Sequence, residues 1–166
     1  MAQKSSKRKN LPQQLDPWVL RYVNRLKKSL KLTDWNIIVL AEPCASDSLG
    51  EIDVVFGQQY AKMQLNKNFK KQKPEELRST IIHELLHCHF APITEAAQEI
   101  LDPIKEDPGG TKIIRSTLNG LEYQQERVID NIAEAIAPHF PLPDIPKGRK
   151  IRVKRKKSQR RVSKKR

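Results

Sequence analysis

The chain has 166 residues, enough for one hydrophobic core, and its 32 Lys and Arg against 19 Asp and Glu give a formal charge of +13. It contains no apolar run near the roughly 18 residues of a membrane-spanning helix, and its charged N-terminus lacks the apolar segment of a secretory signal. Its two cysteines, Cys44 and Cys88, do not indicate a disulfide framework. We therefore expect a monomeric, single-domain protein of the reducing cytoplasm with no membrane partner.

The basic residues are concentrated at the two ends of the chain. Residues 147–166 carry 13 of the 32 Lys and Arg and no acid, whereas residues 10–146 hold all 19 acids and only 15 basic residues. Too few apolar residues and too much like charge predict disordered segments at 1–14 and 143–166, flanking one domain at 15–142. The C-terminal segment 147–166 is suited to bind nucleic acid or another polyanion; a merely solubilising tail is the alternative. No aromatic residue lies among its basic ones, so base stacking is not indicated.

The domain begins with one helical pattern and three strand-like ones. Asp16 and Pro17 are a cap and a first-turn signal for a helix over residues 17–31. Short runs with apolar, β-branched or alternating residues follow it. The strands are expected at residues 35–40, 51–57 and 60–66.

A longer helix is predicted over residues 74–91. Its first residue is a proline, which suits the first turn, and Pro92 is expected to stop it. Apolar residues recur at helical spacing and predict a buried stripe. The stripe consists of Leu77, Ile81, Leu85 and Cys88.

This helix carries the motif His-Glu-Leu-Leu-His. His83 and His87 are four residues apart, so they project from one face with their Cβ atoms about 5–6 Å apart and can bind one ion. Glu84, beside the first histidine, can reach a water on that ion rather than the ion itself. The pattern is typical of a helix-borne zinc site with its own general base.

The segment 101–116 is predicted to be a loop that borders the cleft, either a lid or a plain connector. Prolines and glycines in it break regular structure. They are Pro103, Pro108, Gly109 and Gly110. Lys112 and Arg115 are candidates to contact a substrate carboxylate, with ordinary surface charge as the alternative.

A catalytic zinc usually takes three protein ligands, so a third one is expected outside the motif. The next helical pattern, 117–137, carries Glu126 and Asp130 four residues apart at the flank of its apolar face. Glu126 is the first candidate, because Asp130 can then accept the free ring N–H of a ligating histidine. Glu122, one turn from Glu126, is the main rival, and Glu95 or Asp130 are further alternatives.

HExxH followed by Glu-x-x-x-Asp resembles the gluzincin metallopeptidases. The resemblance implies that His83, His87 and Glu126 bind Zn²⁺, that Glu84 is the catalytic base and that Asp130 orients a ligand. It also implies an α+β, zincin-like fold: an N-terminal helix, a sheet of three or slightly more strands, the HExxH helix and a second ligand-bearing helix. The chain looks like the short, single-domain gluzincin-type proteins of phages and bacteria, and a phage-encoded protein would act in the host cytoplasm.

Two other zincin patterns fit less well. Phe90 and Ile93 stand where the metzincins have a glycine and a third histidine. The SprT-like proteases, which act on DNA-bound proteins, also have a third histidine, and helix 117–137 offers none. His89 points away from the shared face. A similar role, with the basic tail delivering the protease to nucleoprotein, stays open.

The predicted activity is hydrolysis of peptide bonds, with a water on the zinc activated by Glu84. An oxyanion donor is expected as well, and Tyr123, Arg115 and His139 are its candidates. Strand 60–66 is the candidate sheet edge for pairing with an extended peptide. Cys44 is a candidate to bind the zinc as an inhibitory thiolate; the alternative is that it is an ordinary loop cysteine. The alternative function is a nucleic-acid-associated protein with a structural or vestigial zinc site.

Overall fold

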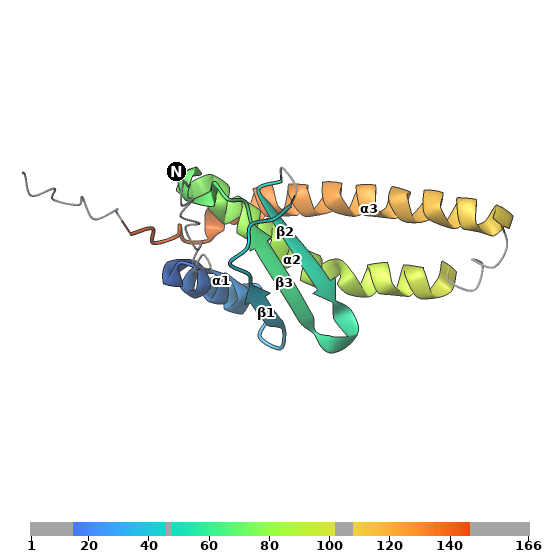
Figure 1. The fold of residues 1–166 in the computed structure, drawn as a ribbon, viewed down its shortest axis with the longest axis horizontal. Helices are drawn as coiled ribbons and strands as arrows, with labels where there is room; N and C mark the ends of the chain where they lie inside the picture. The colour runs from blue at the N-terminus through green and yellow to red at the C-terminus, as the bar shows by residue number, and fades with distance from the viewer. Residues whose placement is uncertain (1–14, 46–47, 102–107, 147–166) are drawn as a thin grey trace, which may run out of the picture.

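The computed structural model describes residues 15–45, 48–101 and 108–146, and Figure 1 shows their arrangement. This part of the chain contains three α-helices and a small mixed sheet of three strands, which confirms the expected α+β class. The helices are α1 (Pro17–Ser29), α2 (Pro74–Leu101) and α3 (Pro108–Ile136). The strands are β1 (Asn36–Val39), β2 (Gly50–Val55) and β3 (Tyr60–Leu65). None of the described helices is long and apolar enough to cross a membrane.

Helix α1 packs one apolar side into the core. Pro17 occupies its first turn as predicted, but Asp16 makes no side-chain capping bond and instead pairs with Lys70 Nζ at 2.7 Å. The pair ties the start of the helix to the short 3-10 turn at Phe69–Lys71. The buried side chains of the helix are Trp18, Val19, Tyr22, Val23 and Leu26.

The sheet has the order β1-β3-β2, so β3 is its central strand. β1 runs parallel to β3 with Ile37 opposite Ala61, and β2 runs antiparallel to β3 with Ile52 opposite Met63. The expectation that 60–66 forms a sheet edge is therefore wrong. A tight connection pairs β2 with one side of β3, and β1 pairs with the other side. The alternation of side chains along β3 shows which face of the strand is buried but not which strands pair with it. β2 is an edge strand instead, and it lies against α2 (Figure 1).

Helix α2 extends ten residues further than predicted, to Leu101. Pro92 lies inside it, although a proline within a helix removes one backbone hydrogen bond and costs about 3 kcal/mol. Tertiary packing offsets this cost, because α3 lies along α2 beyond the proline, where Thr94 Oγ1 donates to Gln125 Oε1 at 2.7 Å. The predicted stripe of Leu77, Ile81, Leu85 and Cys88 is buried.

Helix α3 begins at Pro108, nine residues before the predicted start at 117. The loop predicted at 101–116 is therefore wrong for residues 108–116, and Pro103 lies outside the described residues. A proline in the first turn loses no bond that the helix would otherwise make. Helices α2 and α3 form a long antiparallel pair that projects beyond the sheet (Figure 1).

The segment after α3 closes the core beside the first turns of α2. Tyr22 Oη donates to Pro141 O at 2.8 Å, and Arg78 Nη1 donates to Phe140 O at 2.9 Å. Ile145 is half-buried and packs against the core. The C-terminal end of α3 is thereby fixed next to the N-terminal half of α2, where the motif lies.

Candidate metal centre

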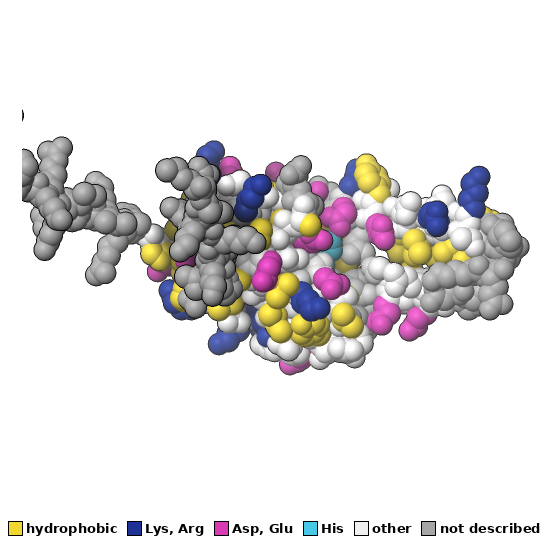
Figure 2. Space-filling view, in the orientation of Figure 1, with side chains coloured by type: hydrophobic (Ala, Val, Ile, Leu, Met, Phe, Trp, Pro, Cys, Tyr) yellow, Lys and Arg dark blue, Asp and Glu magenta, His cyan; other side chains and the backbone are white. Residues whose placement is uncertain are grey.

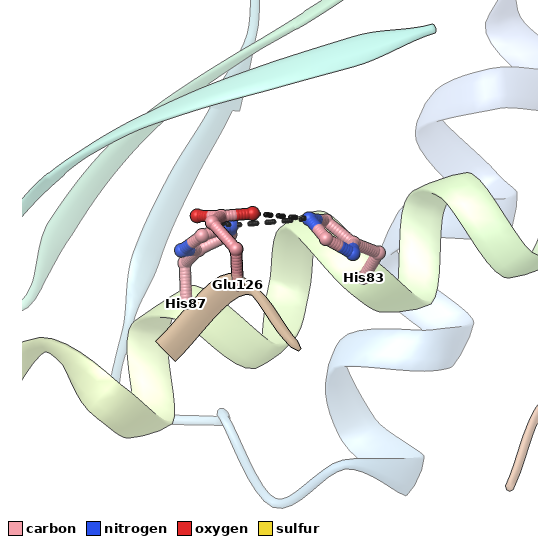
Figure 3. Close-up of side chains that lie close together, drawn as sticks. All are labelled: His83, His87 and Glu126. Atoms are coloured by element: carbon pink, nitrogen blue, oxygen red, sulfur yellow. Dashed lines mark hydrogen bonds and ion pairs between the residues drawn. The ribbon is translucent and has the colours of Figure 1, made fainter. Parts of the chain in front are cut away.

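Three predicted ligand residues converge between α2 and α3. His83 and His87 project from successive turns of α2, and Glu126 reaches them from α3 (Figure 3). The two Nε2 atoms are 3.3 Å apart. Glu126 Oε2 lies 3.3 Å from His83 Nε2, and Oε1 lies 3.5 Å from His87 Nε2. Residues separated by about 40 positions in the sequence thus present their ligand atoms to one point.

These distances fit a metal ion. An ion bound tetrahedrally at about 2.0–2.2 Å holds its ligand atoms roughly 3.3–3.6 Å apart, and the three separations lie in that range. Two imidazoles and one carboxylate form a common zinc ligand set that leaves one position for water or substrate. The cluster of His83, His87 and Glu126 can therefore hold a metal ion.

Asp130 fixes the orientation of His83. Its Oδ1 lies 2.9 Å from His83 Nδ1, on the side of the ring away from the cluster. An N–H at Nδ1 that donates to this carboxylate leaves the Nε2 lone pair directed at the ion position. Asp130 lies one helical turn after Glu126, so α3 supplies both the third candidate ligand and a carboxylate placed to select the histidine tautomer.

Glu84 is almost fully buried, with 6% of its surface exposed, yet it lines the cavity at the cluster. Burial raises the pKa of its carboxyl to about 8, and the negative charges of Glu126 and Glu51 add to the effect. Burial also lowers the pKa of His87, which favours the neutral, metal-binding form of the ring. A divalent cation on the cluster would favour the ionised form of Glu84.

Gly50 allows β2 to approach Glu84 closely. A Cβ atom at position 50 would lie 3.0 Å from Thr80 Cγ2, 3.1 Å from Glu84 Oε1 and 3.2 Å from Glu84 Cγ. A side chain there would require Thr80 and Glu84 to shift, so glycine at residue 50 lets the edge strand approach the Glu84 carboxylate without displacing it. The sequence carries no signal for this role, since an isolated Gly at the start of a strand predicts only a turn or a bulge.

A cavity of about 980 Å³ opens in front of the cluster, between β2, α2 and α3. Its walls include Leu49, Gly50 and Glu51 from the sheet side and Glu134 from α3. A second hollow of about 340 Å³ continues past His87 along β2, and the two share Ile52 and His87. β2 therefore borders a depression on both sides of the cluster.

Other candidates from the sequence lie away from this cavity. The three proposed oxyanion donors, Tyr123, Arg115 and His139, are exposed and do not line it; Tyr123 instead stacks under Arg127. Among the described residues, Glu122 and Cys44 do not belong to the group that can hold a metal. These five residues were candidates because of their positions in the sequence. Position along a helix or loop does not fix the direction in which a side chain points in three dimensions.

The remaining alternatives are placed as follows. Glu95 lines the smaller hollow, and Lys112 is exposed near the distal start of α3. Arg78, which sequence reasoning passed over, is a cationic side chain in the main cavity. It precedes His83 by five residues on α2, so only the structure of the cavity singles it out. Comparisons with protein-family models, curated proteins and solved structures found no match to this chain.

Proposed function

We propose that the chain is a zinc-dependent metallopeptidase of the gluzincin type that hydrolyses internal peptide bonds. The observation that carries this proposal is the convergence of His83, His87 and Glu126 beside the buried, cavity-lining carboxylate of Glu84. A structural metal site does not require a carboxylate beside its ligands, whereas hydrolysis requires a base next to an open ligand position.

Zn²⁺ bound to the cluster would supply a Lewis acid that polarises a carbonyl group and acidifies water. Glu84 would take the proton from the attacking water and then deliver it to the leaving amine. A carboxylate held away from bulk water is a stronger base than an exposed one, and the raised pKa of Glu84 is consistent with that role. Asp130 would keep His83 in the tautomer that binds the ion.

The free edge of β2 is suited to hold the substrate. Among the described strands, β2 is paired on one side only, and it passes directly over Glu84 at Gly50. An extended peptide added to this edge would gain main-chain hydrogen bonds and would cross the cluster. Because hollows flank His87 on both sides, such a peptide would have residues before and after the cleaved bond, as in an endopeptidase.

Replacement of Glu84 by Gln tests the proposal. The amide keeps the size of the side chain but cannot accept a proton, so zinc content should stay near one ion per chain while hydrolysis of a casein-derived peptide library falls at least about 100-fold. Glu99→Gln removes an exposed carboxylate at the far end of α2 and should leave both measurements unchanged. Turnover retained by Glu84→Gln, or none by the zinc-loaded wild type, would contradict the proposal.

A further inference from the structure

The main cavity is strongly acidic. Among the described residues that line it are five carboxylates and one guanidinium. Three of the five already have a role in the proposed reaction: Glu126 faces the histidines, Asp130 holds His83, and Glu84 is the candidate base. Two carboxylates remain for which neither metal binding nor proton transfer gives a reason. They are Glu51 and Glu134.

Glu51 and Glu134 lie on opposite walls of the cavity. Glu51 belongs to the edge strand β2, next to Gly50, and Glu134 lies on α3, one turn after Asp130. Within the described residues, the side chain of neither makes a hydrogen bond or an ion pair, and both residues are exposed. Each therefore presents a solvated negative charge to whatever lies in the cavity.

The charges of this cavity do not cancel each other. Arg78 is the one Lys or Arg among the described lining residues, and its Nη1 donates a hydrogen bond to the Phe140 carbonyl at 2.9 Å. Even with a divalent cation on the cluster, the described lining side chains keep two negative charges in excess when Glu84 is ionised and one when it is protonated. Figure 2 shows acidic side chains gathered around a histidine in the middle of the visible face. Glu84 also points to a ligand in this cavity, because only 6% of its surface is exposed and its carboxylate has no hydrogen-bond partner among the described residues.

We infer that Glu51 and Glu134 select peptide substrates with a Lys or Arg side chain beside the cleaved bond, on the Arg78 side of the metal centre. The inference rests on the proposed peptidase function and names its substrate class. A peptide along β2 would lie in this cavity, whose lining includes both carboxylates, so a long basic side chain on this side would extend toward negative charge. The smaller hollow beyond His87 carries Asp53 and Glu95 but also Ile52, Val54, Val55 and Ala91, so its selection by charge is weaker.

The test uses a series of nonapeptides that are uncharged except for one variable residue. Lys, norleucine or Glu occupies in turn each of the two positions on either side of the central bond. Hydrolysis by the zinc-loaded full chain gives kcat/KM for each peptide, and fluorescence anisotropy with the Glu84→Gln variant gives binding without turnover. The variants compared are Glu51→Gln, Glu134→Gln, the double variant and, as the control outside both hollows, Glu99→Gln.

The expected result is a preference for Lys over norleucine at one position, and a larger one over Glu. Each single variant should lower this preference about two- to fivefold, as for partly exposed ion pairs, and added salt should weaken it. The preference should appear in binding as well as in kcat/KM, and Glu99→Gln should retain it. Equal cleavage and binding of the Lys, norleucine and Glu peptides would overturn the inference, as would an undiminished preference in the double variant.

Failure of the peptidase proposal gives a different pattern. If no peptide is cleaved but Lys peptides bind selectively and lose that selectivity in the double variant, the acidic subsite is supported and the hydrolysis is not. If peptides are cleaved with no charge preference, the hydrolysis stands without the subsite. Absence of both cleavage and selective binding overturns the two together.

Discussion

At the scale of single residues, the site depends on a few contacts that position its side chains. The predicted group His83, Glu84, His87, Glu126 and Asp130 is brought together around one cavity. Spacing along each helix predicted that His83 lies beside His87 and Glu126 beside Asp130, because residues four apart share one face. It left Glu122 as a rival ligand, and the resemblance to gluzincins supplied the pairing of the two helices. The close approach of β2 to Glu84 at Gly50, and the walls that β2 and α3 contribute to the cavity, are not encoded in the motif.

Asp130 should control metal affinity through His83. Replacement by Ala removes the acceptor at 2.9 Å from Nδ1, so zinc affinity should fall about 10- to 100-fold. Asp130→Asn keeps an oxygen that can accept a hydrogen bond from the same N–H, so its zinc affinity should fall less. Competition with a chromophoric chelator measures both variants. Wild-type affinity in Asp130→Ala would show that the ring orientation is fixed by other contacts.

Gly50 should affect catalysis more than metal binding. In Gly50→Ala the new Cβ would lie about 3 Å from Thr80 and Glu84, so the carboxylate must move and the protein should lose about 1–3 kcal/mol of stability. We expect kcat to fall while zinc affinity changes little. Gly120 is the matched control, since a Cβ there meets nothing within 4 Å, and Gly120→Ala should stabilise α3 by about 0.5–1 kcal/mol. An unchanged kcat in Gly50→Ala would contradict the proposal that the close approach at Gly50 positions Glu84 for catalysis.

At the scale of elements, the sequence predicted which segments form helices and strands better than where they end or how they pair. The helix at 17–31, the three strand segments and the buried stripe of α2 follow from local periodicity, and the structure has each of them. The C-terminal end of α2 and the start of α3 were wrong because proline and glycine were treated as breaks, whereas packing between two long helices outweighs their cost. The position of β3 was wrong because strand order depends on contacts between distant segments.

Pro92 should therefore be a weak point of α2. In Pro92→Ala the helix regains a backbone hydrogen bond, which should raise the free energy of unfolding by about 1–3 kcal/mol in urea denaturation. Pro74→Ala, at the first residue of the same helix, should have a much smaller effect. Destabilisation by Pro92→Ala would mean that the proline ring itself packs in a way that alanine cannot replace.

At the scale of the whole molecule, charge separates the chain into an acidic domain and a basic C-terminal segment. Residues 10–146 have a net charge of −4, and residues 147–166 carry 13 positive charges. The acidic cavity belongs to the first part, so the proposed selection of basic substrates and the proposed polyanion binding reside in different parts of the chain.

Removal of residues 147–166 should separate these two functions. A chain that ends at residue 146 should lose most of its affinity for duplex DNA, together with the steep decrease of that affinity with salt, because Lys and Arg contacts to phosphate release counterions. Its zinc affinity should equal that of the full chain. Electrophoretic mobility at several salt concentrations checks the first expectation. Unchanged DNA affinity after truncation would assign polyanion binding to the domain or show that it is absent.

The most direct test of the central claim is an anomalous difference map, at the zinc edge, from crystals of the zinc-loaded protein. We expect one strong peak about 2.0–2.2 Å from the Nε2 atoms of His83 and His87 and from a carboxylate oxygen of Glu126, with Glu84 beside it and not bound to it. A peak ligated by Glu122 or Cys44, or no peak between α2 and α3, would contradict the account.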